Sequence, residues 1–124
     1  MENRQLARQI ALGRIGIGLT ALLTTKLFGL IFAGREAAED PVTRMAARLF
    51  GIRDVALGLA LIDALDNGQP VKRLIQLGMM CDLTDVLAVT AGIRALPWRG
   101  RFLGLALAGG FAAMGAKALA PTPA

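Results

Sequence analysis

The sequence predicts an all-α fold in which residues 1–124 form one integral membrane domain, a bundle of four transmembrane helices. Composition is the first reason. Hydrophobic residues make up 55% of the chain, and its 15 glycines bring the apolar share to about two-thirds, against roughly 45–50% in soluble domains. Segment length is the second reason, because four apolar segments approach or exceed the ~20 residues that cross a bilayer. A soluble, alanine-rich four-helix bundle is the main alternative, since every segment of about 18 residues contains a charge.

The four predicted helices cover residues 6–33, 44–65, 71–93 and 101–119. Each connector contains residues that end one helix and start the next. In the first connector, Asp40 can cap a helix that starts at Pro41. In the second, residues 67–70 form a tight turn, which makes the second and third helices antiparallel neighbours. In the third, Trp98 lies beside Arg99, and an aromatic residue next to a basic one is typical of an anchor at the membrane interface.

Charge and residue types exclude several classes of protein. The chain has 14 basic and 9 acidic residues, a net charge of +5, and most of its basic residues lie at segment ends. This placement favours contact with anionic lipid headgroups, so we expect the lipid bilayer as a partner and no nucleic acid. The sequence has no His and a single cysteine, Cys81, which excludes Cys/His zinc sites, Ser-His-Asp triads and haem ligation by His. We expect no metal, no cofactor and no catalytic residue.

The basic residues at the segment ends do not predict an orientation. Six lie on the side of the N-terminus, the second connector and the C-terminus, and six lie on the other side, whereas an excess normally marks the cytoplasmic side. Acidic residues in the first connector favour cytoplasmic termini, in a multi-pass protein of the plasma membrane. The first helix is expected to be retained rather than cleaved, because its apolar run continues to Ala33, beyond the ~7–15 residues of a signal peptide.

Five ionisable residues lie at mid-depth of the predicted helices: Lys26, Arg53, Asp54, Asp82 and Asp85. Folding the second and third helices about the turn at 67–70 places Arg53 level with Asp82. Asp85 follows three residues later on the same face, so both carboxylates can approach the Arg53 guanidinium. Folding the first and second helices about their connector makes Lys26 the expected partner of Asp54. Ionisable groups are rare in a membrane, so these five predict a polar cluster in the interior of the bundle.

The cost of these charges indicates that they are paired. Arg53 and Asp54 together cost roughly 5–7 kcal/mol at mid-helix on an insertion scale, more than the about 3–5 kcal/mol that the large apolar residues of their helix return. The five groups carry a net charge of −1 when all are ionised. A structural lock, a proton or cation pathway, and recognition of a lipid headgroup or partner subunit all fit this pattern. Arg14, nearer a helix end, is expected to extend to the membrane interface.

The fourth predicted helix contains a ridge of small residues. Gly104, Ala108, Ala112 and Ala116 recur every four residues, a spacing that permits close contact with another helix. That helix can belong to the same bundle or to a second molecule. The ridge therefore predicts internal packing, with a homodimer or a larger membrane complex as the alternative.

Two stretches carry a resemblance to a known group of proteins. Residues 48–59, RLFGIRDVALGL, and residues 82–85, DLTD, resemble small four-helix bacterial membrane proteins of unknown function that are loosely DoxX-like. The resemblance covers the second and third predicted helices, under half of the chain. It implies four helices and a location in the cell inner membrane. It implies no activity and no catalytic residue.

Two function classes follow from these observations. We expect a non-enzymatic accessory or interaction subunit of a membrane complex, because the loops are short and no soluble domain is present. The alternative is a small proton- or cation-coupled transporter or channel, for which balanced basic residues would indicate an antiparallel dimer. Small multidrug transporters have comparable length, but this chain has Lys26 where they have a Glu. An enzyme is the least supported class, because Asp82, Thr84 and Asp85 offer too few ligands for a divalent cation.

Overall fold

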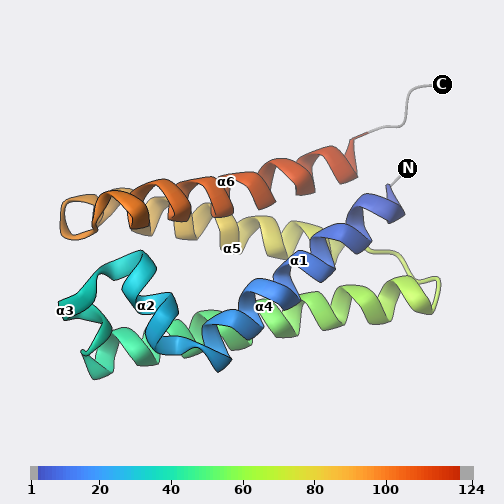
Figure 1. The fold of residues 1–124 in the computed structure, drawn as a ribbon. Coiled ribbons are helices and arrows are strands. Elements are labelled where there is room, and N and C mark those ends of the chain that lie inside the picture. The colour runs from blue at the N-terminus through green and yellow to red at the C-terminus, as the bar shows by residue number, and fades with distance from the viewer. Residues whose placement is uncertain (1–2, 121–124) are drawn as a thin grey trace.

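The computed structural model of the chain describes residues 3–120, and all regular structure among them is helical (Figure 1). The α-helices are α1 (Arg4–Leu23), α2 (Thr25–Ala33), α3 (Arg35–Ala38), α4 (Pro41–Asp66), α5 (Lys72–Ala91) and α6 (Trp98–Leu119), and a 3₁₀ turn (Ile93–Ala95) precedes α6. The all-α fold class is confirmed for these residues. The predicted count of four helices is not confirmed, because the described residues form six α-helices.

The extra helices arise where the first predicted helix, 6–33, breaks at Thr24. The backbone of Thr24 leaves the helical region, with φ −122° and ψ 50°. Threonine hydroxyls flank the break and donate to carbonyls one turn earlier, from Thr20 to Gly16 at 2.9 Å and from Thr25 to Ala21 at 2.8 Å. Such hydroxyl bonds to the preceding turn bend helices. As a result α2 turns away from the line of α1 (Figure 1).

The chain then reverses through α3 and enters α4 as the sequence predicts. Gly34 has a φ of +95°, a conformation that glycine adopts readily. Asp40 caps α4, since its carboxylate accepts a hydrogen bond of 2.9 Å from the amide of Val42, and Pro41 is the first helical residue. At the far end of α4, Gly68 has a φ of +65° in the predicted tight turn to α5.

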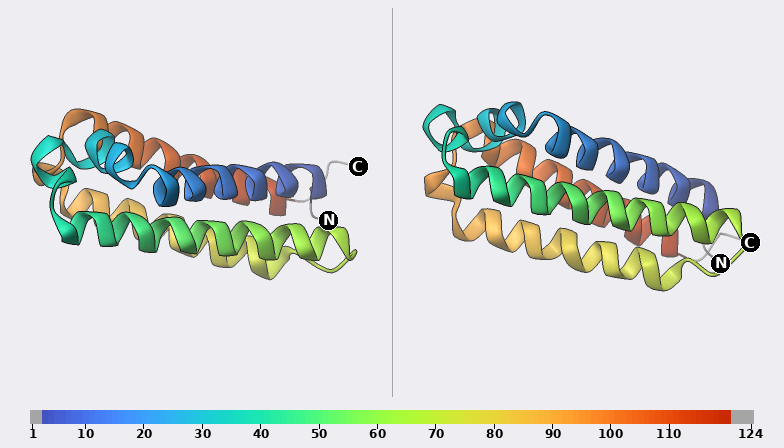
Figure 2. Two further views of the ribbon diagram at one scale, coloured as in Figure 1. Left: turned by 60° about the horizontal axis from the view of Figure 1, so that its bottom comes forward. Right: turned by 90° about the horizontal axis from the view of Figure 1, so that it is seen from below.

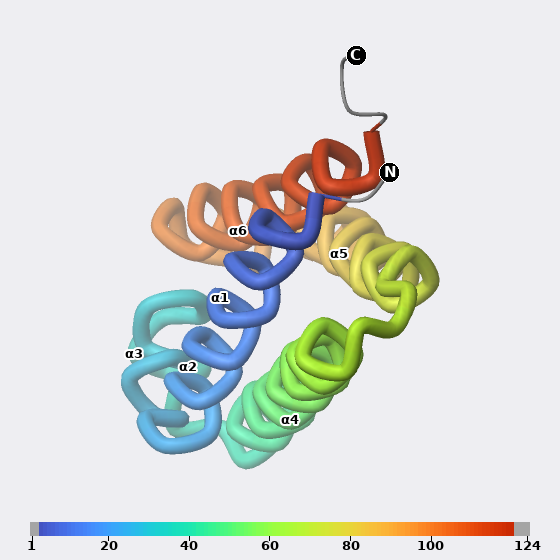
Figure 3. The backbone as a smooth tube through the Cα atoms, turned by 90° about the vertical axis from the view of Figure 1, so that its right-hand side faces the viewer, coloured from blue at the N-terminus to red at the C-terminus, as the bar shows by residue number. Residues whose placement is uncertain are grey.

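The four long helices form two antiparallel pairs, α1 with α4 and α5 with α6 (Figures 2 and 3). The contact between α4 and α5 is much smaller than the contact within either pair, although a short turn joins them. The start of α1 and the end of α6 lie at the same end of the bundle, where the amide of Asn3 donates to the carbonyl of Ala118 at 2.8 Å. The short α2 and α3 lie at the opposite end.

Glycine allows α1 and α4 to approach closely. A Cβ on Gly18 would lie 2.6 Å from the carbonyl oxygen of Gly51, and one on Gly58 would lie 2.7 Å from the carbonyl oxygen of Ala11. The buried residues of both helices recur at alternating spacings of three and four, the pattern of a left-handed helix pair. On α1 they include Ala7, Ala11, Arg14, Gly18 and Ala21, and on α4 they include Ala47, Gly51, Asp54, Gly58 and Leu61.

The apolar core occupies the end of the bundle that contains the termini. Its buried residues are Ala7, Ile10, Ala11, Leu61, Ala64, Leu65, Val71, Ile75 and Ala118, from all four long helices and the α4–α5 turn. No residue of α2 or α3 belongs to it. The two halves of the bundle therefore differ, with a packed core in one half and the broken helix in the other.

Polarity is distributed as expected for a membrane protein rather than a soluble one. Three helices, α1, α5 and α6, are long and apolar enough to cross a membrane. Helix α4 has 26 residues but carries six ionisable side chains. Large apolar side chains that are more than half exposed occur on each long helix, among them Leu12, Leu59, Leu87 and Phe102. Arg14, Asp54 and Asp82 are buried, although charged residues are rarely buried unless they are paired.

The predicted ridge on α6 does not form one packing face. Ala108 is buried, Gly104 and Ala112 are half-buried, and Ala116 is exposed. A step of four residues exceeds one helical turn by about 40°, so the last position of the ridge lies about 120° from the first. The residues that pack inward toward the end of α6 are instead Gly115 and Ala118. A Cβ on Gly115 would lie 2.6 Å from Met79 of α5.

The close approach of α1 and α4 predicts a difference between two glycines of α1. Gly18→Ala should lower the free energy of unfolding by about 1–3 kcal/mol, because the added methyl group meets the backbone of α4. Gly16→Ala should be neutral or stabilising by roughly 0.5–1 kcal/mol, since no atom lies within 4 Å of a Cβ at that position. Thermal unfolding of both variants in mild detergent tests this. Equal destabilisation by the two substitutions would contradict the packing of α1 on α4.

Candidate functional site

Three charged side chains lie in the interior of the bundle. Arg14 is 3% exposed, and Asp54 and Asp82 are each 2% exposed. Arg14 comes from α1, Asp54 from α4 and Asp82 from α5, so three different helices bring them together. Arg53 and Asp85 lie next to them and are partly buried. We call these five residues the charged layer, because they separate the apolar core from the half of the bundle that contains α2.

Arg14 and Asp82 form a bidentate ion pair. Nη1 of Arg14 donates to Oδ1 of Asp82 at 3.0 Å, and Nη2 donates to Oδ2 at 2.6 Å. Two parallel charge-assisted bonds of this kind are among the strongest that side chains make. Gly78, one turn before Asp82, provides the space, because a Cβ there would lie 2.7 Å from Nη2 of Arg14. The Phe111 ring, with its centroid 4.9 Å from Cζ of Arg14, adds a cation–π contact from α6.

Arg53 and Asp85 form a second bidentate pair. Nη1 and Nη2 of Arg53 donate to the two carboxylate oxygens of Asp85 at 3.1 and 2.6 Å. The guanidinium also lies over Phe50, with Cζ 5.1 Å from the ring centroid. Its Nε is buried without a hydrogen-bond partner. Both bidentate pairs cross between the helix pairs, since each arginine lies on α1 or α4 and each aspartate on α5.

Asp54 is left without a full counter-charge. Its nearest cationic atoms are Nη2 of Arg53 at 3.4 Å and Nη1 of Arg14 at 3.8 Å. Both distances exceed the 2.7–2.9 Å of a strong charge-assisted hydrogen bond. The two guanidinium groups are already engaged by Asp82 and Asp85, so the surplus negative charge of the layer resides mainly on Asp54. A buried carboxylate that has only a long hydrogen bond from Arg53 and a longer contact with Arg14 is costly unless it takes up a proton or attracts a further cation.

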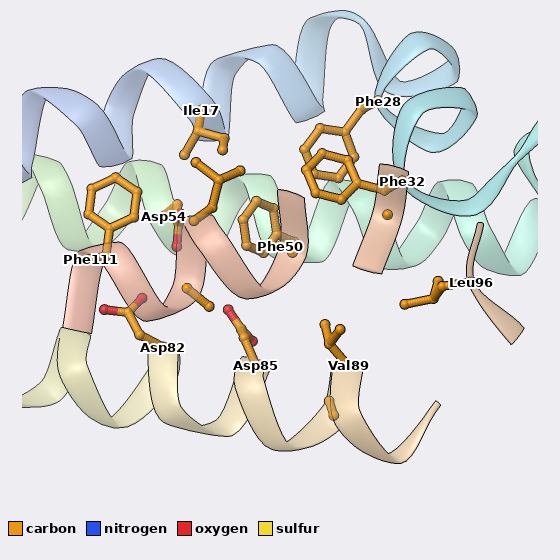
Figure 4. Close-up of a pocket in the computed structure, with 15 residues that line it drawn as sticks. Ile17, Phe28, Phe32, Phe50, Asp54, Asp82, Asp85, Val89, Leu96 and Phe111 are labelled. Carbon is orange, nitrogen blue, oxygen red and sulfur yellow. The ribbon is translucent and has the colours of Figure 1, made fainter. Parts of the chain in front are cut away.

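The charged layer borders a cavity of about 240 Å³. All three carboxylates lie at its edge, together with apolar side chains from every long helix and from α2 (Figure 4). Asp82 and Asp85 point toward it from α5, and Phe28, Phe32 and Phe50 line its other side (Figure 4). The cavity therefore lies in the half of the bundle that the apolar core does not fill.

The structure brings together four of the five predicted residues. Arg53 binds Asp85, one of the two carboxylates predicted to approach it. Asp82, the other, is level with residue 53 in the prediction but binds Arg14 instead. The prediction leaves Arg14 out of the buried charges, so Asp82 has no partner in it other than Arg53.

Lys26 is not part of the charged layer, contrary to the prediction that it pairs with Asp54. Its side chain is 70% exposed, and Nζ lies 3.0 Å from Oε1 of Glu39 in the first connector. Lys26 and then Arg44, whose Nη2 lies 3.1 Å from Oε2, hold the pKa of Glu39 below its ordinary value of 4.5. The break at Thr24 explains the error, because the depth calculation assumes a straight helix through residue 33.

Arg14 is the functional residue that the sequence reasoning missed. Its position on the first helix predicts a side chain that extends to the membrane interface, but the structure buries it. A signal was present in the sequence, since Ala7, Ala11, Gly18 and Ala21 form a stripe of small residues with Arg14 at its centre. An arginine in the middle of such a stripe must face the neighbouring helix.

Trp98 lies away from the charged layer, whereas Cys81 directly precedes Asp82 on α5. Trp98 is the first residue of α6 and is 76% exposed, and its role as an interface anchor stays a prediction. Cys81 is half-buried. Within residues 3–120, no group of three or more His, Cys, Asp or Glu side chains is arranged to hold a metal ion.

Comparison with protein-family models, curated proteins and solved structures gave no match. The fold and the site thus define the class of this protein by themselves. It is an all-α protein with three helices that can cross a membrane and a buried cluster of Arg14 with aspartates. The resemblance to DoxX-like proteins stays a prediction.

The observed pairing predicts the outcome of a double-substitution experiment. Arg14→Met should lower the free energy of unfolding by about 3–5 kcal/mol, because it leaves Asp82 buried without a partner. Adding Asp82→Leu should recover part of that loss, since both charges are then absent. Thermal unfolding in detergent measures both effects.

Arg53→Met provides the matched control for this cycle. Combined with Asp82→Leu it should recover nothing, because Arg53 binds Asp85 and the double variant leaves Arg14 and Asp85 unpaired. Recovery with Arg53→Met and none with Arg14→Met would overturn the pairing described above and restore the one expected from the sequence.

Proposed function

We propose that the chain is a multi-pass protein of the cell membrane in which α4 crosses the bilayer together with α1, α5 and α6. Helix α4 has 26 residues, about 39 Å at 1.5 Å per residue, whereas the hydrocarbon core is about 30 Å thick. Of its mid-helix charges, Asp54 is buried and Arg53 is partly buried against Asp85 of α5, and its other ionisable residues lie toward its ends. Both termini then lie on one side, which we assign to the cytoplasm.

We further propose that this protein is a small proton- or cation-coupled transporter or channel that uses the charged layer. The observation that supports this proposal is Asp54, a buried carboxylate with no bidentate partner at the edge of a cavity. A purely structural lock would need only the two bidentate pairs. Burying a third carboxylate costs free energy. Ionisable groups in a membrane interior usually have a function that explains why they are present.

The helices are arranged as two bodies that can move against each other, which provides a mechanical basis for transport. Helices α1 and α4 form one body and α5 and α6 the other, and packing within each pair is far more extensive than between α4 and α5. Many transporters work by rocking one helix bundle against another around a central site. Here the central site is the charged layer, and movement of the bodies would expose Asp54 to either side in turn.

Proton uptake by reconstituted protein tests this function. Proteoliposomes that contain a pH-sensitive dye, with valinomycin and potassium to balance charge, should acidify after an acid jump faster than protein-free liposomes. Asp54→Asn should slow this by at least about tenfold, the effect of ~1.4 kcal/mol on a barrier. Asp66→Asn is the matched control on the same helix, because Asp66 is exposed and pairs with Arg8 at the bundle end. Equal rates in the wild type and Asp54→Asn would contradict the proposal and leave the layer a structural lock.

An interaction subunit is the second candidate function, and the outward face of α6 favours it. Ala106, Gly110 and Ala113 are exposed on this helix, and no atom lies within 4 Å of a Cβ built on Gly109 or Gly110. Small residues on a lipid-facing surface allow a second helix to pack closely. Homodimerisation or assembly into a larger membrane complex would use this face.

Disulfide cross-linking tests the interaction face. In a Cys81→Ser background, Gly110→Cys should give an oxidised dimer in native membranes at low protein expression, because the two α6 helices would bring the thiols together. Leu83→Cys, on the exposed face of α5, is the control and should stay monomeric. If both variants cross-link to the same extent, the contact is random collision and α6 is not an interface.

A further inference from the structure

The cavity beside the charged layer is lined almost wholly by apolar atoms. Its volume is about 240 Å³. The carboxylates of Asp54, Asp82 and Asp85 lie at one side of it, and the rings of Phe28, Phe32 and Phe50 lie at the other (Figure 4). Small-molecule sites usually combine a mostly apolar lining with a few polar groups that fix orientation. The lining therefore favours a ligand with an apolar body and one charged group.

The sign of that charge follows from the pairing in the charged layer. Both guanidinium groups are held by bidentate bonds to Asp82 and Asp85. Asp54 has only the longer contacts of 3.4 and 3.8 Å. A ligand that complements this site is positively charged, since an anion would face an uncompensated carboxylate at short range.

The aromatic wall also favours a cation. Phe28 stacks on Phe32 and on Phe50, with ring centroids 4.5 and 5.5 Å apart. The faces of aromatic rings attract positive charge, especially organic ammonium groups. The protein already uses this property at the cavity, where Arg53 lies over Phe50 and Arg14 lies over Phe111.

A metal ion fits the site poorly. The three carboxylates are not close enough to form a metal-binding group, and no other such group occurs in the described part of the chain. Calcium takes six to eight oxygen ligands and magnesium requires octahedral geometry. An organic cation needs one carboxylate and an apolar wall, which the cavity provides.

We propose that the cavity binds a monovalent organic cation, an ammonium group with an aromatic or branched aliphatic body. The ammonium group lies near Asp54, and the body lies against Phe28 and Phe32. This proposal rests on the proposed transport function and names the class of substrate for it. The ligand supplies the counter-charge that Asp54 lacks.

Binding of radiolabelled benzyltrimethylammonium to the full-length protein in mild detergent tests the proposal. A scintillation proximity assay should show saturable binding. Neopentylbenzene, which has the same shape without the charge, should compete at least about tenfold more weakly, and so should potassium chloride at equal concentration. Asp54→Asn should weaken binding by at least about tenfold, because an unpaired charge is the basis of recognition. Asp66→Asn should leave it unchanged.

A second pair of variants tests the location of the site without altering any charge. Ala108 is buried and lines the cavity, so Ala108→Leu should fill part of it and weaken benzyltrimethylammonium binding. Ala60→Leu, on the exposed face of α4 and outside the cavity lining, should bind as the wild type does. Circular dichroism and gel filtration of each variant show which of them are folded. If Asp54→Asn does not fold, Ala108→Leu and its control decide whether the cavity is the binding site.

The outcomes separate this proposal from the transport function. Equal competition by neopentylbenzene, or unchanged binding in both folded Asp54→Asn and Ala108→Leu, would overturn the organic-cation site. If benzyltrimethylammonium does not bind while Asp54-dependent acidification persists, the substrate class is wrong and the transport function stands. If it binds as described while acidification equals that of empty liposomes, the site stands and the transport function fails.

Discussion

Two bidentate ion pairs that cross between the helix pairs are the interaction on which the rest of this structure depends. Arg14 reaches from α1 to Asp82, and Arg53 reaches from α4 to Asp85. In a membrane no water can solvate these groups, so each charge needs its partner to be tolerable. The ion pairs therefore set the depth at which α5 lies beside α1 and α4. They do this where direct packing between α4 and α5 is slight.

The small residues of the α1–α4 contact bring the charged side chains close enough to form these ion pairs. Gly18, Gly51 and Gly58 let the two backbones come into contact. Arg14 and Asp54 therefore lie in the same buried interface between α1 and α4. Gly78 removes the side chain that would otherwise occupy the space of the Arg14 guanidinium. Glycine thus has two uses in this chain, close helix packing and room for a long charged side chain.

Much of the fold could be predicted from the sequence, because its strongest signals are local. The structure confirms several features that depend only on short stretches of sequence. They are the helical secondary structure, the Asp40 cap, Pro41 at the first helical position and the turn at Gly68. The sequence also predicts that Asp85 approaches Arg53, and the two are paired, because the connector between their helices is short. The break at Thr24 was missed because the hydrogen bonds from threonine hydroxyls to the preceding turn leave only a weak signal in the sequence, and the surrounding residues still favour a helix. That miss placed Lys26 in the interior and left Arg14 outside it.

The separation of Arg14 from Asp82 has a consequence for how the protein is made. The two residues are 68 positions apart, so synthesis of α1 is complete well before α5 leaves the ribosome. During that interval the guanidinium of Arg14 has no bidentate partner. Helix α4, which is made before α5, contributes only Asp54, whose contact with Arg14 is 3.8 Å. The bidentate ion pair of Arg14 therefore forms only once α5 has been made, although α1 is made well before it.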